Sequence, residues 1–117
     1  MPVTVLPDEI SAALVSPKAY GEWDDLHAKF TWARRNAPVA LAQHEDYDPF
    51  WAVTRHADIL EVSRNNARFA SGVRQTTLTH REIDKIVRGQ TPNGDGHLIR
   101  SLVQMDAPDH MKHRLLT

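Results

Sequence analysis

The sequence contains no cysteine. This absence excludes disulfide bonds, thiolate zinc sites and a cysteine nucleophile from these residues. Long apolar runs are absent too: none approaches the roughly 20 residues that cross a bilayer, and no basic-then-apolar signal peptide opens the chain. The five glycines are scattered at expected turns and helix ends, so no phosphate-binding glycine loop is predicted. We expect a cytoplasmic protein without membrane association.

Charge of either sign is nearly balanced. The net charge of −1 gives no reason to expect nucleic-acid binding. Acidic residues predominate in residues 1–60 and basic residues in residues 61–117. Either solvated faces or an anionic partner of the second half explains this distribution. Hydrophobic residues (41%) and charged residues (25%) are at the proportions of a folded soluble chain, so we treat residues 1–117 as one region.

Helical periodicity is clearest over residues 23–36, where Trp23, Leu26, Phe30 and Ala33 recur at helical spacing. A short helix is predicted before it, over residues 17–20, ended by Gly21. Residues 1–15 show no clear period and are expected to be an ordered or frayed lead-in. Another helix is predicted from about residue 56 to residues 65–66.

Two short apolar runs, residues 39–43 and 50–54, predict a β-hairpin. The polar residues 44–49 between them predict a loop longer than a two-residue turn. A further short strand is expected over residues 67–71.

Residues 72–97 are predicted to be a long irregular loop with one embedded helix. Thr79 and Glu82 have the spacing of a capping box, and Gly89 is expected to end this helix. The order of these elements indicates an α+β, mainly helical fold: helix, β-hairpin, helix, long loop with a short helix, and the start of a further helix.

The final stretch predicts the start of that further helix. Asp106 is expected to be its N-cap, and Pro108 is tolerated in the first turn. His110 and Arg114 are four residues apart, so both side chains can converge on one anion. A helix that stops within a few turns suggests that the chain is a piece of something larger.

These segments together resemble the N-terminal quarter of a bacterial cytochrome P-450, a haem-thiolate monooxygenase. The resemblance rests on FWAVTRHADI at residues 50–59, APV at 37–39, RFAS at 68–71, and MDAPDH at 105–110 followed by Arg114. One departure is Ala107, where many members have a second proline. The resemblance implies that residues 1–117 are an incomplete part of a larger haem-binding domain.

The resemblance also implies roles for particular residues. His110 and Arg114 would bond a haem propionate. Val73, Leu78, and Leu102 or Val103 could contact a lipophilic substrate, such as a terpenoid, steroid or other hydrocarbon-rich molecule; packing under a loop is the alternative for each.

The outer surface of the last helix, with Lys112 and His113, would dock a ferredoxin- or flavodoxin-type redox partner, although solvated surface explains these two residues equally well. The family's thiolate cysteine, oxygen-activating helix and Glu-x-x-Arg segment are not in this sequence. We therefore expect the chain alone to be inactive and to self-associate through exposed apolar surface.

Two other interpretations of the sequence are a binding module and a metal-binding protein. A small non-enzymatic α+β binding module, complete at Thr117, is the alternative to the monooxygenase. His110 and His113 have the spacing of a helical metal-ligand pair, but no further ligands lie at a recognisable spacing, so no metal site is predicted.

Overall fold

The computed structural model describes residues 3–72, 78–91, 94 and 102–116. Its elements are α1 (Asp8–Val15), α2 (Pro17–Gly21), α3 (Trp23–Asn36), β1 (Val39–His44), β2 (Tyr47–Val53), α4 (His56–Arg64), α5 (Arg81–Gln90), the 3-10 helix η1 (Leu102–Gln104) and α6 (Asp109–Arg114). The chain forms two compact units, Met1–Glu61 and Val62–Thr117. Within the described ranges, no helix has the length and apolar character needed to span a membrane.

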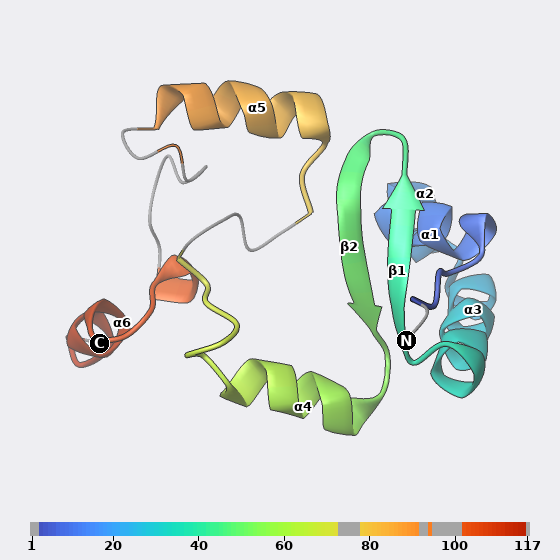
Figure 1. Ribbon diagram of the computed structural model, residues 1–117, viewed down its shortest axis with the longest axis horizontal. Helices are drawn as coiled ribbons and strands as arrows, with labels where there is room; N and C mark the ends of the chain where they lie inside the picture. Colours follow the sequence, from blue (N-terminus) through green and yellow to red (C-terminus); the bar gives the residue numbers. More distant parts are fainter. Residues whose placement is uncertain (1–2, 73–77, 92–93, 95–101, 117) are drawn as a thin grey trace. The chain divides into compact units, whose positions relative to one another are not determined.

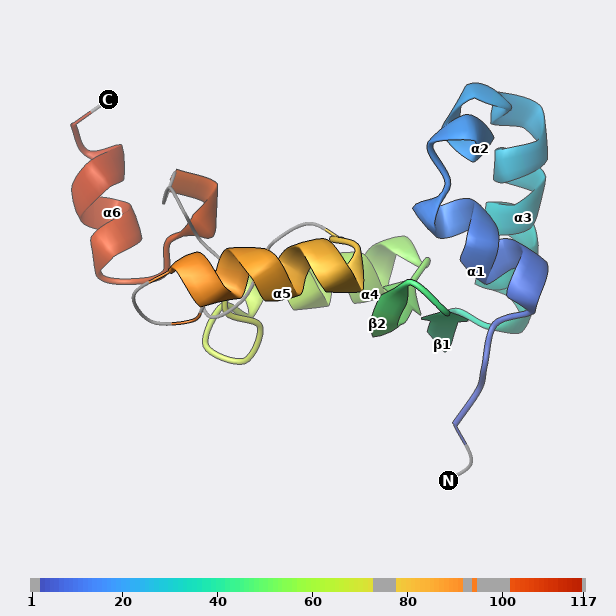
Figure 2. The same ribbon diagram turned by 90° about the horizontal axis from the view of Figure 1, so that it is seen from above.

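The β-hairpin of the first unit is confirmed. Strands β1 and β2 pair antiparallel, with Ala40 opposite Ala52 and Leu41 opposite Trp51. The chain before α1 pairs with the free edge of β1: the Leu6 N–H donates to the Leu41 carbonyl (2.9 Å) and the Leu41 N–H to the Thr4 carbonyl (2.8 Å). Figures 1 and 2 show α1, α2 and α3 on the β1 side of this hairpin.

The hairpin loop is shorter than the sequence predicts, so that prediction was wrong. Only Glu45 and Asp46 separate the strands, because β2 begins at Tyr47 and continues through polar residues. The register shifts between Ala42 and His44, which accommodates the extra residue. The His44 Nδ1 accepts the Asp46 N–H at 3.1 Å, so a side chain stabilises the tight turn.

Helix α1 was not predicted and corrects the expectation of a lead-in without a period. Its buried residues include Ser11 and Ala13, which are too small to give a strong apolar period. Ile10 joins Leu6 and alanines of α3, β1 and β2 in the core of this unit. Ala40 is completely buried, so a close approach of the helices to the sheet depends on small side chains.

The helices predicted around residues 17–36 and after residue 56 are confirmed as α2, α3 and α4. In α3, Leu26 and Ala33 are buried whereas Trp23 is exposed. The spacing of the apolar residues therefore predicted the helix correctly, but only part of its apolar stripe is buried.

The second unit differs from the sequence prediction in its local details. Residues 67–71 form a turn, not a strand: the Phe69 N–H donates to the Asn65 carbonyl at 2.9 Å. Helix α5 is confirmed, but its cap is His80, whose side chain accepts the Glu82 N–H. The helix also continues past Gly89 to Gln90, because its glycine keeps a helical backbone there.

We predict that Leu6→Ala destabilises the first unit. Leu6 is 2% exposed, and truncating a buried leucine costs about 2–5 kcal/mol through lost burial and the remaining cavity. Chemical denaturation of the chain measures the change in unfolding free energy. Val3→Ala is the control, since Val3 is 57% exposed. Equal effects of the two substitutions would contradict this description of the core.

Candidate functional site

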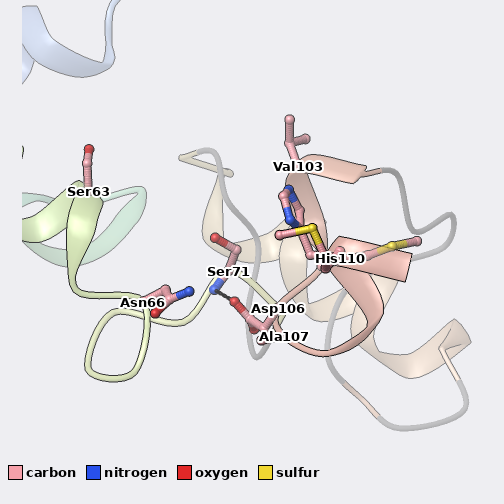
Figure 3. Close-up of a pocket in the computed structure, with 9 residues that line it drawn as sticks. Ser63, Asn66, Ser71, Val103, Asp106, Ala107 and His110 are labelled. Atoms are coloured by element: carbon pink, nitrogen blue, oxygen red, sulfur yellow. Dashed lines mark hydrogen bonds between the residues drawn. The ribbon is translucent and has the colours of Figure 1, made fainter. Parts of the chain in front are cut away.

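A cavity of about 290 Å³ lies within the second unit, between the end of α4 and the start of α6. Figure 3 shows its lining. The lining residues are Ser63, Asn66, Ser71, Val103, Met105, Asp106, Ala107, His110 and Met111. The wall combines a carboxylate, an imidazole and small polar groups with apolar side chains. This composition suits a ligand that has both a polar end and an apolar body.

Helix α6 begins later than the sequence predicts. It runs from Asp109 to Arg114 with Pro108 at the N-cap position, and none of the described side chains caps it. The expectation that the Asp106 carboxylate caps the helix is therefore wrong. The backbone of Asp106 serves the first turn, because its carbonyl accepts the His110 N–H at 2.9 Å.

The Asp106 carboxylate instead binds a distant segment of the chain. Its Oδ1 accepts the Ser71 N–H at 2.7 Å, and its Oδ2 accepts the Gly72 N–H at 2.6 Å. Two consecutive amides that converge on one anion form a nest, and hydrogen bonds to a charged acceptor are stronger than neutral ones. We call this pair of bonds the Asp106 clasp; Figure 3 draws its bond to Ser71 as a dashed line.

The imidazole of His110 is half-buried in the cavity wall. Other histidines use a ring nitrogen locally: the His113 Nδ1 lies 2.9 Å from the Asp109 carbonyl oxygen, and the His80 Nδ1 accepts the Glu82 N–H. In the part of the chain that the structure describes, the His110 imidazole has no such hydrogen bond. Both of its ring nitrogens are therefore available to a ligand.

Arg114 lies one helical turn beyond His110 on α6 and is exposed. Residues four apart project from one side of a helix, so the guanidinium can reach the same ligand as the imidazole. Lys112 and His113 are exposed and share the last turn of the helix with Arg114. Three basic residues at a helix C-terminus also interact favourably with the helix dipole.

The predicted substrate-contacting residues are placed differently from one another. Val103 lines the cavity together with His110, although it is 71% exposed. Leu78 precedes α5, is 50% exposed and does not line this cavity. Leu102 is the first residue of η1, and Val73 lies outside the described residues.

Sequence reasoning missed the polar side of the cavity, which comes from Ser63, Asn66 and Ser71. It also missed the Asp106 clasp, whose partners are 35 and 34 residues away in the sequence. An aspartate two residues before a proline is compatible with a cap or with a distant contact. No local pattern distinguishes these two uses.

The known proteins that match this chain are bacterial cytochromes P450. The chain is 30% identical over 112 residues to Cytochrome P450-terp of a Pseudomonas species, and 34% identical over 88 residues to Linalool 8-monooxygenase of Pseudomonas putida. Among solved structures, it matches the cytochrome P450 CYP108D1 of Novosphingobium aromaticivorans with a TM-score of 0.88 and 36% identity. These alignments confirm the resemblance and the predicted fold class.

The matches cover most of this chain and only a part of each relative. They span 96% and 75% of the chain but 26% and 21% of the two curated relatives. The structural match spans 98% of the chain and 28% of the solved protein, in its N-terminal part. No family model matches the chain.

We predict that the two histidines of α6 differ in tautomer. When its Nδ1 faces a carbonyl oxygen, neutral His113 must carry the proton on Nδ1, whereas no hydrogen bond among the described residues fixes the tautomer of His110. Nitrogen NMR of the neutral side chains measures this directly, with His110→Gln and His113→Gln assigning the signals. A single fixed tautomer at His110, or averaged signals at His113, would contradict the geometry.

Proposed function

We propose that the parent protein of this chain is a haem-thiolate monooxygenase, because the chain is homologous to the N-terminal region of bacterial cytochromes P450. The parent protein is the product of the whole reading frame that contains residues 1–117. It would insert one oxygen atom of O₂ into a lipophilic small molecule, with electrons from a redox partner. The observation that best supports the proposal is that the available His110 imidazole lies in the cavity wall, one helical turn before Arg114.

The residues of α6 fit the carboxylate end of a haem. In the part of the chain that the structure describes, no hydrogen bond occupies the His110 ring, and the Arg114 guanidinium is a planar fork of N–H donors that suits a carboxylate. The cavity of about 290 Å³ accommodates a side group, not a whole macrocycle. We therefore assign to this chain the binding of one haem propionate edge.

The reactive part of the site would lie outside these residues. When bound, a haem with a thiolate ligand supplies the oxygen chemistry. The chain has no cysteine, so the thiolate must come from another part of the parent protein. Residues 1–117 would then be an incomplete part of a larger haem-binding domain, and on their own they would be inactive.

The substrate we propose is a terpenoid. One relative is named Linalool 8-monooxygenase, and Val103, Met105 and Met111 provide apolar surface next to His110. Steroids and other hydrocarbon-rich molecules would also suit an apolar surface, and a steroid is the comparison ligand in the test below. Val73, Leu78 and Leu102 stay predictions as further contacts.

We also propose that the exposed end of α6 docks an acidic ferredoxin or flavodoxin. Lys112 and His113 are exposed and adjacent to Arg114, which concentrates basic groups at one helix end. Charge complementarity of this kind increases association rates, and salt weakens it. Cytoplasmic localisation and self-association of the isolated chain stay predictions from the sequence.

The non-enzymatic binding module is the weaker candidate. It offers no reason for similarity to oxygenases along nearly the whole chain. It would also leave the available His110 imidazole without a use. We therefore retain the monooxygenase as the proposed function.

We predict that His110→Ala and Arg114→Ala each weaken haem retention in the parent protein. Removing one charge-assisted hydrogen bond to a propionate should accelerate haem loss by about 10- to 100-fold. Transfer of haem to an excess of a haem-scavenging protein measures the rate. Lys112→Ala is the control, because it removes a positive charge from the same helix without facing the propionate. Unchanged rates in both α6 variants would refute the propionate assignment.

We predict that the haem-loaded parent protein binds linalool, and that Val103→Ala weakens this binding. Loss of two methyl groups from an apolar contact should raise the dissociation constant by about threefold to tenfold. The haem absorption spectrum during ligand titration measures the constant, and Val3→Ala supplies the same truncation in the first unit. Binding of a steroid but not of linalool would reject the terpenoid class.

A further inference from the structure

Asp106 joins two parts of the cavity wall that are distant in the sequence. Its carboxylate holds the amides of Ser71 and Gly72, while its own carbonyl accepts the His110 N–H. One residue thus connects the 71–72 segment to the first turn of the helix that carries His110. Ser71, Asp106 and His110 all line the same cavity (Figure 3).

We propose that Asp106 is a positioning residue: through the Asp106 clasp it fixes where His110 stands in the cavity. This inference rests on the proposed haem site. Its basis is the geometry of the clasp, in which both carboxylate oxygens are used at 2.6–2.7 Å. Helix α6 has only six residues and no side-chain cap, so its own hydrogen bonds fix its start weakly. The clasp supplies the tertiary restraint that the short helix lacks.

The clasp requires two acceptors on one side chain. A carboxylate accepts hydrogen bonds at both oxygens, whereas an asparagine presents one oxygen and one NH₂ donor. Asp106→Asn therefore sets the new NH₂ group against the Ser71 or Gly72 N–H while leaving the size of the side chain almost unchanged. Asp109→Asn is the matched control: it removes the same charge three residues away, at an exposed position in the first turn of α6.

Amide hydrogen exchange of the parent protein tests the clasp itself. In the unsubstituted protein, the Ser71 and Gly72 amides should be protected. In Asp106→Asn they should exchange about 10- to 100-fold faster, the effect of losing charge-assisted hydrogen bonds, and in Asp109→Asn they should not change. Unprotected amides in the unsubstituted protein overturn the proposal, and this measurement needs no variant to fold.

A double-mutant cycle on haem dissociation tests the positioning role. If Asp106 acts through His110, Asp106→Asn accelerates haem loss about fivefold or more when His110 is present and about twofold or less in the His110→Ala background. A purely structural role produces the same acceleration in both backgrounds, and that result overturns the proposal. If His110→Ala alone leaves haem retention unchanged, the proposed haem site fails and the positioning role fails with it. Protection of the Ser71 and Gly72 amides would then still test whether the Asp106 clasp forms.

Discussion

The Asp106 carboxylate is the interaction on which the second unit depends. It accepts two consecutive backbone N–H groups from a segment about 35 residues earlier in the chain, at 2.7 and 2.6 Å. Backbone amides that leave a turn need partners, and an anion satisfies two of them at once. Because the same residue also accepts the His110 N–H, the cavity wall and helix α6 share one anchor.

The first unit is organised by a different constraint, the volume available between helices and sheet. Ala33, Ala37, Ala40, Ala42 and Ala52 are all buried around Leu6 and Ile10. Small side chains allow the backbones to approach closely, and a larger residue there would be overpacked. The large aromatic residues Trp23, Trp32 and Trp51 are exposed instead. In a longer parent protein, these exposed rings are surfaces on which further segments can pack.

Local sequence patterns correctly predicted the elements whose formation depends on residues close in the sequence. Apolar spacing identified α3 and α4, a proline start identified α2, and paired apolar runs identified the hairpin. Prediction from the sequence was wrong where a contact with a distant residue determines the local structure. Helix α1 buries the small side chains of Ser11 and Ala13, which give no strong apolar period. The Asp106 carboxylate accepts the Ser71 and Gly72 N–H groups instead of capping α6. Spacing and resemblance point to His110 and Arg114, whereas the availability of the His110 imidazole among the described residues is evident only from the structure.

The proposed function requires that His110 and Arg114 of α6 hold a haem carboxylate. A crystal structure of the haem-loaded parent protein tests it most directly. We expect nitrogens of His110 and Arg114 to lie within about 3 Å of the oxygens of one propionate. Propionates bonded only by residues outside α6, with His110 turned away from the haem, would contradict it.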